Sequence, residues 1–331
     1  MPGFIHNLMP IEEQPQYLAA GVTRREVWSW AMYDFANSGY TTVVITAIFN
    51  AYFVAVVARN EEWGTFAWTV SLAVSYALII LTAPVLGAYA DAYALKKRLL
   101  FLSTIGCVLF TALLYFVGAG DLWLAVVLIV LSNFFFTCGG NLISAFLPEL
   151  AQSRALGKVS GWGWSFGYIG GLLSLGLSLA YVTWAQGQGK PAEQFVPVTM
   201  LITASLFALS SIPTFLFLKE RAVPQPHVSG RTVIREAFGR LGETLAHVRD
   251  YRDLARFLGC IVFYQAGIQT IITLAAIYAQ QAMGFDTGDT MFLVLVVNVT
   301  ASVGAFAFGS IQDKIGHIPT IALTLAGWIV M

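Results

Sequence analysis

One acidic residue lies inside a strongly apolar stretch near the start of the chain. Asp34 belongs to the segment WAMYDFANSGYTTVVITAIFNAYFVAVVA, residues 30–58. A carboxylate at the centre of a bilayer costs about 2.5 to 3.5 kcal/mol on insertion scales, so it persists where it faces protein or water and has a use. This carboxylate could carry a proton, or it could pair with an ammonium group of a bound solute.

Polar residues follow this acid at helical spacing. Asn37, Ser38 and Thr41 lie three, four and seven residues beyond Asp34, on one side of an otherwise apolar helix. Hydrocarbon cannot hydrogen-bond such a stripe, so the stripe must face other helices or a hydrated cavity. We interpret it as cavity lining. The structural alternative is that Asp34 lies near the interface and caps a neighbouring helix or pairs with a basic loop.

Two other apolar segments carry amides at helical spacing. Asn133 and Asn141 lie in one segment, and Gln265 and Gln269 lie one turn apart in the other. A single amide in a membrane helix is often an interhelical hydrogen bond worth about 0.6 kcal/mol, so packing explains any one of them. As a set they are candidates, with the Asp34 stripe, for a site that binds a substrate or a proton.

The composition predicts an all-α polytopic membrane protein. Hydrophobic residues make up 57% of the 331 residues and charged residues only 11%, against roughly a quarter charged in soluble domains. A spanning helix needs about 20 apolar residues. Eight runs meet this length, at approximately 29–57, 66–90, 99–118, 122–147, 159–184, 196–218, 255–281 and 289–311. A ninth run starts near Pro319 and stops at Met331, so we expect a truncated second half with about nine spans present.

The loops predict an orientation and a division of the chain. An amino terminus in the cytoplasm places every Lys and Arg except Arg59 and Lys190 on the cytoplasmic side, which agrees with the positive-inside rule. We therefore expect an N-terminal six-helix bundle over 1–218, a cytoplasmic linker over 219–254 and a partial C-terminal bundle over 255–331. The linker has the pattern of an amphipathic helix, either on the membrane surface or in a solvated connection.

Small residues form a stripe in the fifth span. Gly163, Gly167 and Gly171 recur at four-residue intervals. Small residues on one helix face let two backbones approach closely, so this stripe predicts a helix-packing seam.

A short pattern occurs at the end of two different spans. GAYADAYALKKR covers Gly87–Arg98, and GSIQDKIGH covers Gly309–His317. Both place Asp four residues after Gly, at Asp91 and Asp313, with basic residues following. This pattern resembles the loop signature of the major facilitator superfamily, although Ala94 stands where that signature usually has Gly.

A narrower resemblance rests on three further segments. WAMYDFANSGYTT, NLISAFLPELA and GKVSGWGWSFGYIGG resemble the unknown-major-facilitator family, whose relatives include the autophagy-related vacuolar amino-acid effluxers of fungi. The resemblance implies a secondary transporter with two parallel six-helix halves. It also implies that charged loop residues lock and release an inner gate. The residues concerned are Asp91, Lys96, Lys97, Arg98, Glu149 and Asp313, for which the alternative is exposed ion pairs worth under about 1 kcal/mol.

These observations predict a carrier of the cell membrane that moves a small polar solute, with an amino acid as the candidate, outward by alternating access. We expect a monomer in contact with lipid, a coupling proton, no cofactor, no metal and no nucleic-acid partner. Enzymatic activity is not expected, because no His or Cys pairs with a carboxylate within the spans. The alternative function is a lipid-handling or signalling membrane protein without solute flux.

Overall fold

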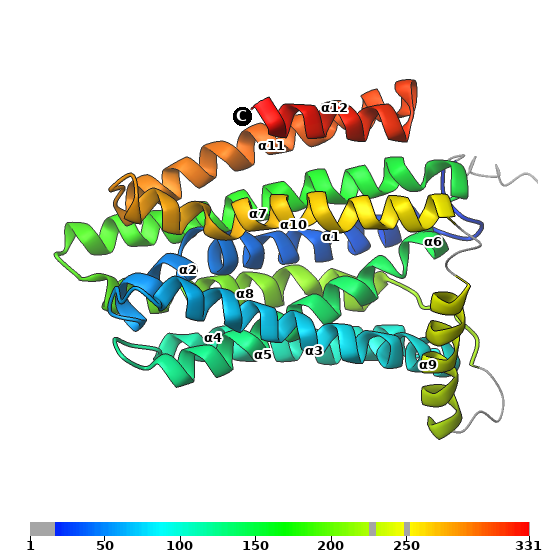
Figure 1. The fold of residues 1–331 in the computed structure, drawn as a ribbon, viewed down its shortest axis with the longest axis horizontal. Coiled ribbons are helices and arrows are strands. Elements are labelled where there is room, and N and C mark those ends of the chain that lie inside the picture. The colour runs from blue at the N-terminus through cyan, green and yellow to red at the C-terminus, as the bar shows by residue number, and fades with distance from the viewer. Residues whose placement is uncertain (1–16, 225–229, 248–251, 331) are drawn as a thin grey trace, which may run out of the picture.

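The structure is built almost entirely from helices (Figure 1). It is a computed structural model that describes residues 17–224, 230–247 and 252–330. Within these ranges eight helical runs are long and apolar enough to cross a membrane, which confirms the eight predicted spans. Their elements are α1 (Arg24–Tyr40), η1 (Thr41–Ala47), α2 (Phe49–Tyr52) and η2 (Phe53–Val57), which together form the first span; then α3 (Gly64–Tyr93), α4 (Lys96–Leu113) with η3 (Leu114–Phe116), α5 (Leu122–Ser144), α7 (Leu156–Gly187), α8 (Ala192–Phe217), α10 (Arg252–Gln281) and α11 (Thr287–Ile315).

The remaining helices are shorter. α6 (Leu147–Leu150) and η4 (Ser153–Ala155) connect α5 to α7. α9 (Gly230–Ala246) lies across one end of the bundle beside α3, and α12 (His317–Val330) runs along α11 (Figure 1).

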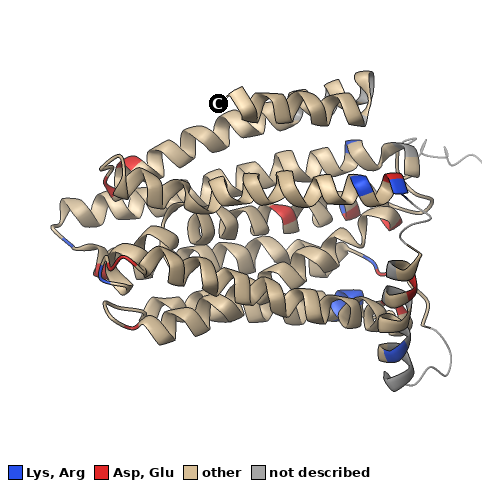
Figure 2. Cartoon of the chain, viewed as in Figure 1, with Lys and Arg blue, Asp and Glu red and all other residues tan. Residues whose placement is uncertain are grey.

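Charged residues gather at the two ends of the bundle, and between these ends the view shows one acidic segment, on α1 (Figure 2). We call the end where α1 and α4 begin the basic end; it includes Arg24, Lys96 and Arg221. We call the opposite end, which includes Arg59 and Lys190, the far end. This distribution is what an apolar slab between two aqueous layers requires.

The first span is anchored in the middle of the bundle. α1 packs against α7 and α8, and α4 packs against α5 and α8. The Tyr33 hydroxyl lies 2.9 Å from Thr104 Oγ1, and its ring meets Phe207 edge-on with centroids 5.8 Å apart. Trp30 Nε1 donates to the Ile143 carbonyl at 2.9 Å. Buried aromatic rings with satisfied polar atoms fix the rotation of α1, and therefore the direction of its polar stripe.

The first span departs from the uniform α-helix that the sequence predicted. Two segments of it, Thr41–Ala47 and Phe53–Val57, are π-helical. All six residues of 41–46 are β-branched, and such side chains crowd the preceding turn of an α-helix. π-Helical turns occur frequently at functional sites. Side chains beyond Tyr40 therefore point in other directions than a continuous α-helix would give them.

Ala94 ends α3 in a backbone conformation that favours glycine. Its φ is 51° and its ψ is 53°, in the left-handed region, and its N–H donates to the Ala90 carbonyl. A left-handed residue at this position is a common way to stop a helix, and glycine adopts it without the steric cost of a Cβ. The structure thus gives a physical reason why the related loop signature has glycine here.

The Ala94→Gly substitution is expected to stabilise the protein by about 1 kcal/mol, because it removes the left-handed strain of an alanine. The measurement is thermal unfolding of the purified protein in detergent. The same substitution at exposed Ala73, in the middle of α3, is the control and should destabilise by a similar amount, because glycine weakens a helix interior. A lower unfolding midpoint for Ala94→Gly would contradict the strained turn.

Candidate functional site

The polar stripe of α1 lies against the glycine stripe of α7. A Cβ placed on Gly163 would come within 2.7 Å of Asp34 Oδ2, and one on Gly167 would come within 2.7 Å of Ser38 Oγ. At Gly171 it would meet Thr42 Oγ1 at 2.8 Å. Any side chain at these three positions would push the helices apart. The glycines therefore give the polar groups of α1 room against the α7 backbone.

The carboxylate of Asp34 has no hydrogen bond or salt bridge with any residue that the structure describes. The residue is ten positions beyond Arg24, about 15 Å along the helix at 1.5 Å per residue, and it is half-buried. It therefore neither caps a described helix nor pairs with a described basic loop. A carboxylate at this depth without a cationic partner can accept donors from a ligand or take up a proton.

Asn37 adds a second unmatched acceptor one turn away. Its Oδ1 atom is buried without a hydrogen-bond partner among the described residues. The Thr41 hydroxyl donates to the Asn37 carbonyl at 3.2 Å. An unsatisfied buried acceptor costs about 1 to 3 kcal/mol. Asp34, Asn37, Ser38 and Thr41 are all half-buried, so the predicted stripe forms one partly accessible acceptor-rich patch.

Asn50 joins the first span to α10. The residue is fully buried, and its amide donates to the Thr46 carbonyl at 2.9 Å and to the Thr273 carbonyl at 3.2 Å. The main contacts of α10 with this span are with η1 and α2, beyond Tyr40. The first span and α10 are therefore held together on the far-end side of the Asp34 patch.

Gln265 and Gln269 lie on the same face of α10 as Thr273. Gln269 is about one turn from Thr273 toward the basic end, and Gln265 is about two turns from it in the same direction. Both side chains are exposed. The structure does not bring them into contact with Asp34. It places them on the helix face that meets the first span at Thr273.

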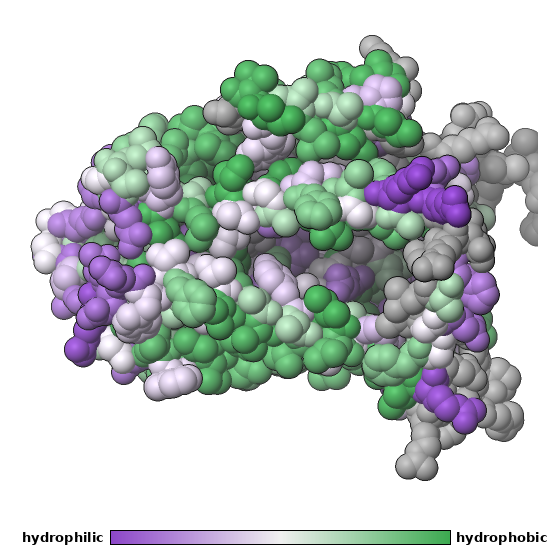
Figure 3. All heavy atoms as spheres, in the orientation of Figure 1, coloured by the Kyte–Doolittle hydropathy of each residue, from purple (hydrophilic) through white to green (hydrophobic). Residues whose placement is uncertain are grey.

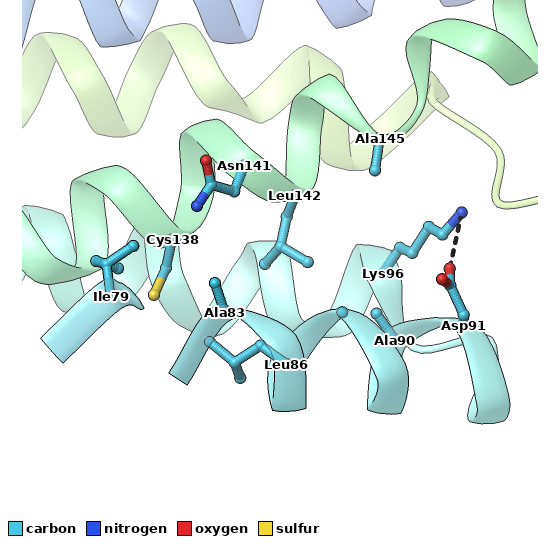
Figure 4. Close-up of a pocket in the computed structure, with 11 residues that line it drawn as sticks. Ile79, Ala83, Leu86, Ala90, Asp91, Lys96, Cys138, Asn141, Leu142 and Ala145 are labelled. Atoms are coloured by element: carbon cyan, nitrogen blue, oxygen red, sulfur yellow. Dashed lines mark ion pairs between the residues drawn. The ribbon is translucent and has the colours of Figure 1, made fainter. Parts of the chain in front are cut away.

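The α5 candidates separate into two environments. Asn133 is buried and donates to Ser75 Oγ of α3 at 3.0 Å, which is the interhelical bond expected of an isolated amide. Asn141 is exposed and borders a cavity of about 110 Å³ between α3 and α5. In Figure 4 Cys138 and Leu142 point from α5 toward Ala83 of α3 across this cavity. Asn133 and Asn141 therefore do not form one site.

The face between α10 and α3 is hollowed in its middle, and hydrophilic surface appears inside the hollow (Figure 3). Apolar surface surrounds it on both sides. In such a hollow, polar groups of an apolar bundle can meet water.

Charged side chains form a network at the basic end. Lys96 Nζ lies 3.2 Å from Asp91 Oδ1 and 3.1 Å from Glu149 Oε1. The backbone N–H of Arg221 donates to Glu149 Oε2 at 3.2 Å, and the guanidinium of the same residue reaches Glu26 Oε2 at 2.7 Å. The network ties together the basic-end termini of α1, α3, α4, α6 and α8.

Glu220 extends this network to the backbone of α4. Its two carboxylate oxygens accept from the N–H groups of Lys96 and Lys97 at 2.7 and 3.1 Å. A carboxylate at a helix N-terminus satisfies orphan donors and complements the helix dipole. The Lys97 ammonium donates to the Leu218 carbonyl at 2.6 Å.

The predicted gate set also contains Arg98 and Asp313. Arg98 is exposed. Asp313 lies in α11, but its side chain is outside the described part of the chain. Among described side chains, the structure brings together Asp91, Lys96 and Glu149 from the predicted set.

Sequence reasoning missed Glu26, Glu220 and Arg221. Glu26 carried a local signal, because Thr23 and Glu26 form a capping box at the start of α1. Glu220 and Arg221 carried none, since they act on residues more than 70 positions away. No set of three or more described His, Cys, Asp and Glu residues is arranged to hold a metal.

The chain is similar to proteins of known families over most of its length. Residues 22–331 match a family model described as "Vacuole effluxer Atg22 like". An uncharacterized transporter of the major facilitator type from Bacillus subtilis, YxiO, is 28% identical over 294 residues, which cover 86% of this chain and 67% of YxiO. The ectoine/proline transporter ProP of Corynebacterium glutamicum is 21% identical over 90% of this chain and 60% of its own length. This chain therefore spans only part of the length of both relatives.

A solved structure shares the fold. The xylose transporter XylE from E. coli, in a partially occluded inward-open conformation, superposes with a TM-score of 0.61 at 14% sequence identity. The match covers 89% of this chain and 75% of XylE. At this identity the likeness concerns the helix arrangement alone, which is that of the major facilitator fold.

The charge network predicts unequal effects for two basic residues of α4. Lys96→Gln should destabilise the protein by about 1 to 2 kcal/mol, because Asp91 and Glu149 lose a shared, largely buried cation. Arg98→Gln removes the same charge from an exposed position and should change stability by no more than about 0.5 kcal/mol. Thermal unfolding of the two variants in one detergent makes the comparison, and equal effects would refute the network.

Proposed function

Because the chain belongs to the Atg22-like family of vacuole effluxers, within the transporters of the major facilitator superfamily, we propose that it moves a small polar solute across a membrane by alternating access. One observation carries this proposal. The Asp34 patch is an acceptor-rich, partly accessible surface in an otherwise apolar span, and that span meets α10 mainly on the far-end side of the patch.

The contacts between the first span and α10 support an opening at the basic end. Asn50 and Thr273 hold the two helices together 16 residues beyond Asp34, which is roughly 24 Å of helix. The exposed glutamines of α10 lie on the basic-end side of this junction. A solute would reach the patch from the basic end, and the transport cycle would break the junction to open the far end.

The solute that fits is one rich in hydrogen-bond donors. The Asp34 carboxylate and Asn37 Oδ1 are both acceptors without described partners, and an ammonium group supplies three donors and a compensating charge. An amino acid or a related amine meets this requirement. We assign the basic end to the cytoplasm from the distribution of Lys and Arg, and we propose export across the cell membrane.

Two six-helix units joined by the segment that contains α9 would perform this cycle as rigid halves. The network around Lys96 and Glu149 lies within the first half and would hold its basic end as one body while the halves rock. A proton on Asp34 would couple transport to the pH gradient.

Asp34→Asn is expected to abolish solute movement driven by a pH gradient, because the amide cannot take up and release a proton. Proteoliposomes that hold the protein would be tested with a panel of labelled amino acids, with and without a gradient. Asp253→Asn, at a fully exposed carboxylate in the first turn of α10, is the matched control and should keep wild-type rates. Transport by Asp34→Asn at the wild-type rate, with the same gradient dependence, would overturn the role of this residue.

Asn50→Ala is expected to open the far end. The interhelical bond to the Thr273 carbonyl, worth about 0.6 kcal/mol, is lost, which corresponds to a shift of roughly three-fold in the closed-to-open ratio. The readout is the rate at which a water-soluble maleimide modifies a cysteine introduced as Thr46→Cys. The protein also carries Cys260→Ser, because Cys260 is an exposed native cysteine that would react as well. Gln188→Ala, in an exposed loop, is the control. No increase over that control would refute the junction as a far-end closure.

A further inference from the structure

A second cavity lies at the basic end between the start of α1 and the start of α7. Its volume is about 340 Å³. Arg24, Val27, Trp28 and Ala31 line it from α1, at the spacing of a single helix face. Trp162 and Phe166 line it from α7, and Tyr17 and Leu18 close it from the segment before α1.

This cavity shares no lining residue with the Asp34 patch. The last lining residue on α1 is Ala31, three positions before Asp34, so the cavity lies nearer the basic end on the same side of the helix. The α7 residues that line the cavity, Trp162 and Phe166, are likewise distinct from the glycines that meet the patch. The two sites can therefore be tested with separate substitutions.

The rim of the cavity is cationic. The Lys158 ammonium lies 5.3 Å from the centre of the Tyr17 ring and 5.4 Å from that of Trp162, where cation–π attraction holds it at the edge. Arg24 is exposed at the opposite edge. None of the described lining residues is acidic, and the nearby carboxylate of Glu26 is buried against Arg221. Two positive charges are thus available to an anion from outside.

An apolar ridge continues from the cavity along α7. Lys158, Trp162 and Phe166 follow each other at four-residue steps, and Ile169, Leu173 and Leu177 extend this face with exposed fractions of 51%, 45% and 44%. The ridge from Trp162 to Leu177 is about 22 Å long at 1.5 Å per residue, longer than the roughly 15 Å of one leaflet of a bilayer. A hydrocarbon chain fits it.

We propose that this cavity binds an anionic phospholipid of the surrounding bilayer. The phosphate lies between Arg24 and Lys158, the glycerol region fills the aromatic pocket, and an acyl chain follows the exposed face of α7. The pocket is built from both α1 and α7, so the bound lipid contacts both helices at the basic end. The transport proposal does not use this site. A negative result for lipid binding would therefore leave the transport proposal standing, and a negative result for transport would leave the lipid proposal standing.

The test is thermal unfolding of the purified protein in detergent micelles that contain added dioleoyl phosphatidylglycerol or dioleoyl phosphatidylcholine. The anionic lipid should raise the unfolding midpoint at a concentration roughly ten-fold or more below that of the zwitterionic lipid, since each basic residue adds about 1 kcal/mol toward an anionic headgroup. The double variant Arg24→Gln, Lys158→Gln should lose this preference. Ala31→Phe should weaken the response by filling the pocket with the charges intact.

Lys219→Gln is the matched control. It removes one exposed positive charge from the same end, outside the cavity, and should keep the preference. Equal responses of the wild type to both lipids would overturn the proposal. So would loss of the preference in Lys219→Gln to the same extent as in the double variant, because that would show a general surface attraction. An equal midpoint shift with glycerol 3-phosphate alone would show a soluble-anion site instead of a lipid site.

Discussion

The structure depends on how polar groups are accommodated inside an apolar bundle. A hydroxyl or carboxylate within hydrocarbon must find a protein or water partner. Here the stripe that begins at Asp34 lies against Gly163, Gly167 and Gly171, whose missing side chains leave room beside the α7 backbone. The same close approach fixes α1 and α7 to each other, so one contact both builds the bundle and sets the direction of the candidate site.

The two ends of the bundle are organised by different forces. At the basic end, ion pairs around Lys96, Glu149 and Arg221 join the termini of several helices that are distant in sequence. At the far end, the junction between the first span and α10 includes one amide–carbonyl bond, from Asn50 to Thr273. Bonds of this kind are individually weak in membranes. A junction whose hydrogen bonding is this limited can break and re-form during a cycle without large energetic cost.

The helices and their polar faces could be predicted from the sequence because they follow from local periodicity. Eight spans are present within about five residues of their predicted bounds. The glycine spacing of α7 predicted a seam, but not that its partner is the Asp34 stripe, since spacing describes one helix only. The π-helical turns of 41–47 were missed because they depend on crowding of β-branched residues in a packed helix.

The candidate site was predicted less completely than the helices, because sequence spacing describes residues on one helix and not the contacts between helices. Asp34, Asn37 and Thr41 lie on one helix, and their mutual position follows from helix geometry. The environment of Asn133, which bonds Ser75, depends on the packing of α5 on α3 and has no local signal. Glu220 accepts a hydrogen bond from the α4 N-terminus, 124 residues away in the sequence. Residue spacing along the chain could not predict this contact either.

The central claim is that one face of α1 meets water at the basic end while its other faces do not. Single cysteines introduced at positions 34 and 36–41, in a protein that also carries Cys260→Ser, and modified with a water-soluble maleimide, test this directly. The account predicts modification at Asp34, Asn37, Ser38 and Thr41, and none at Ala36, Gly39 or Tyr40. Uniform modification along the segment, or protection of the whole polar face, would contradict it.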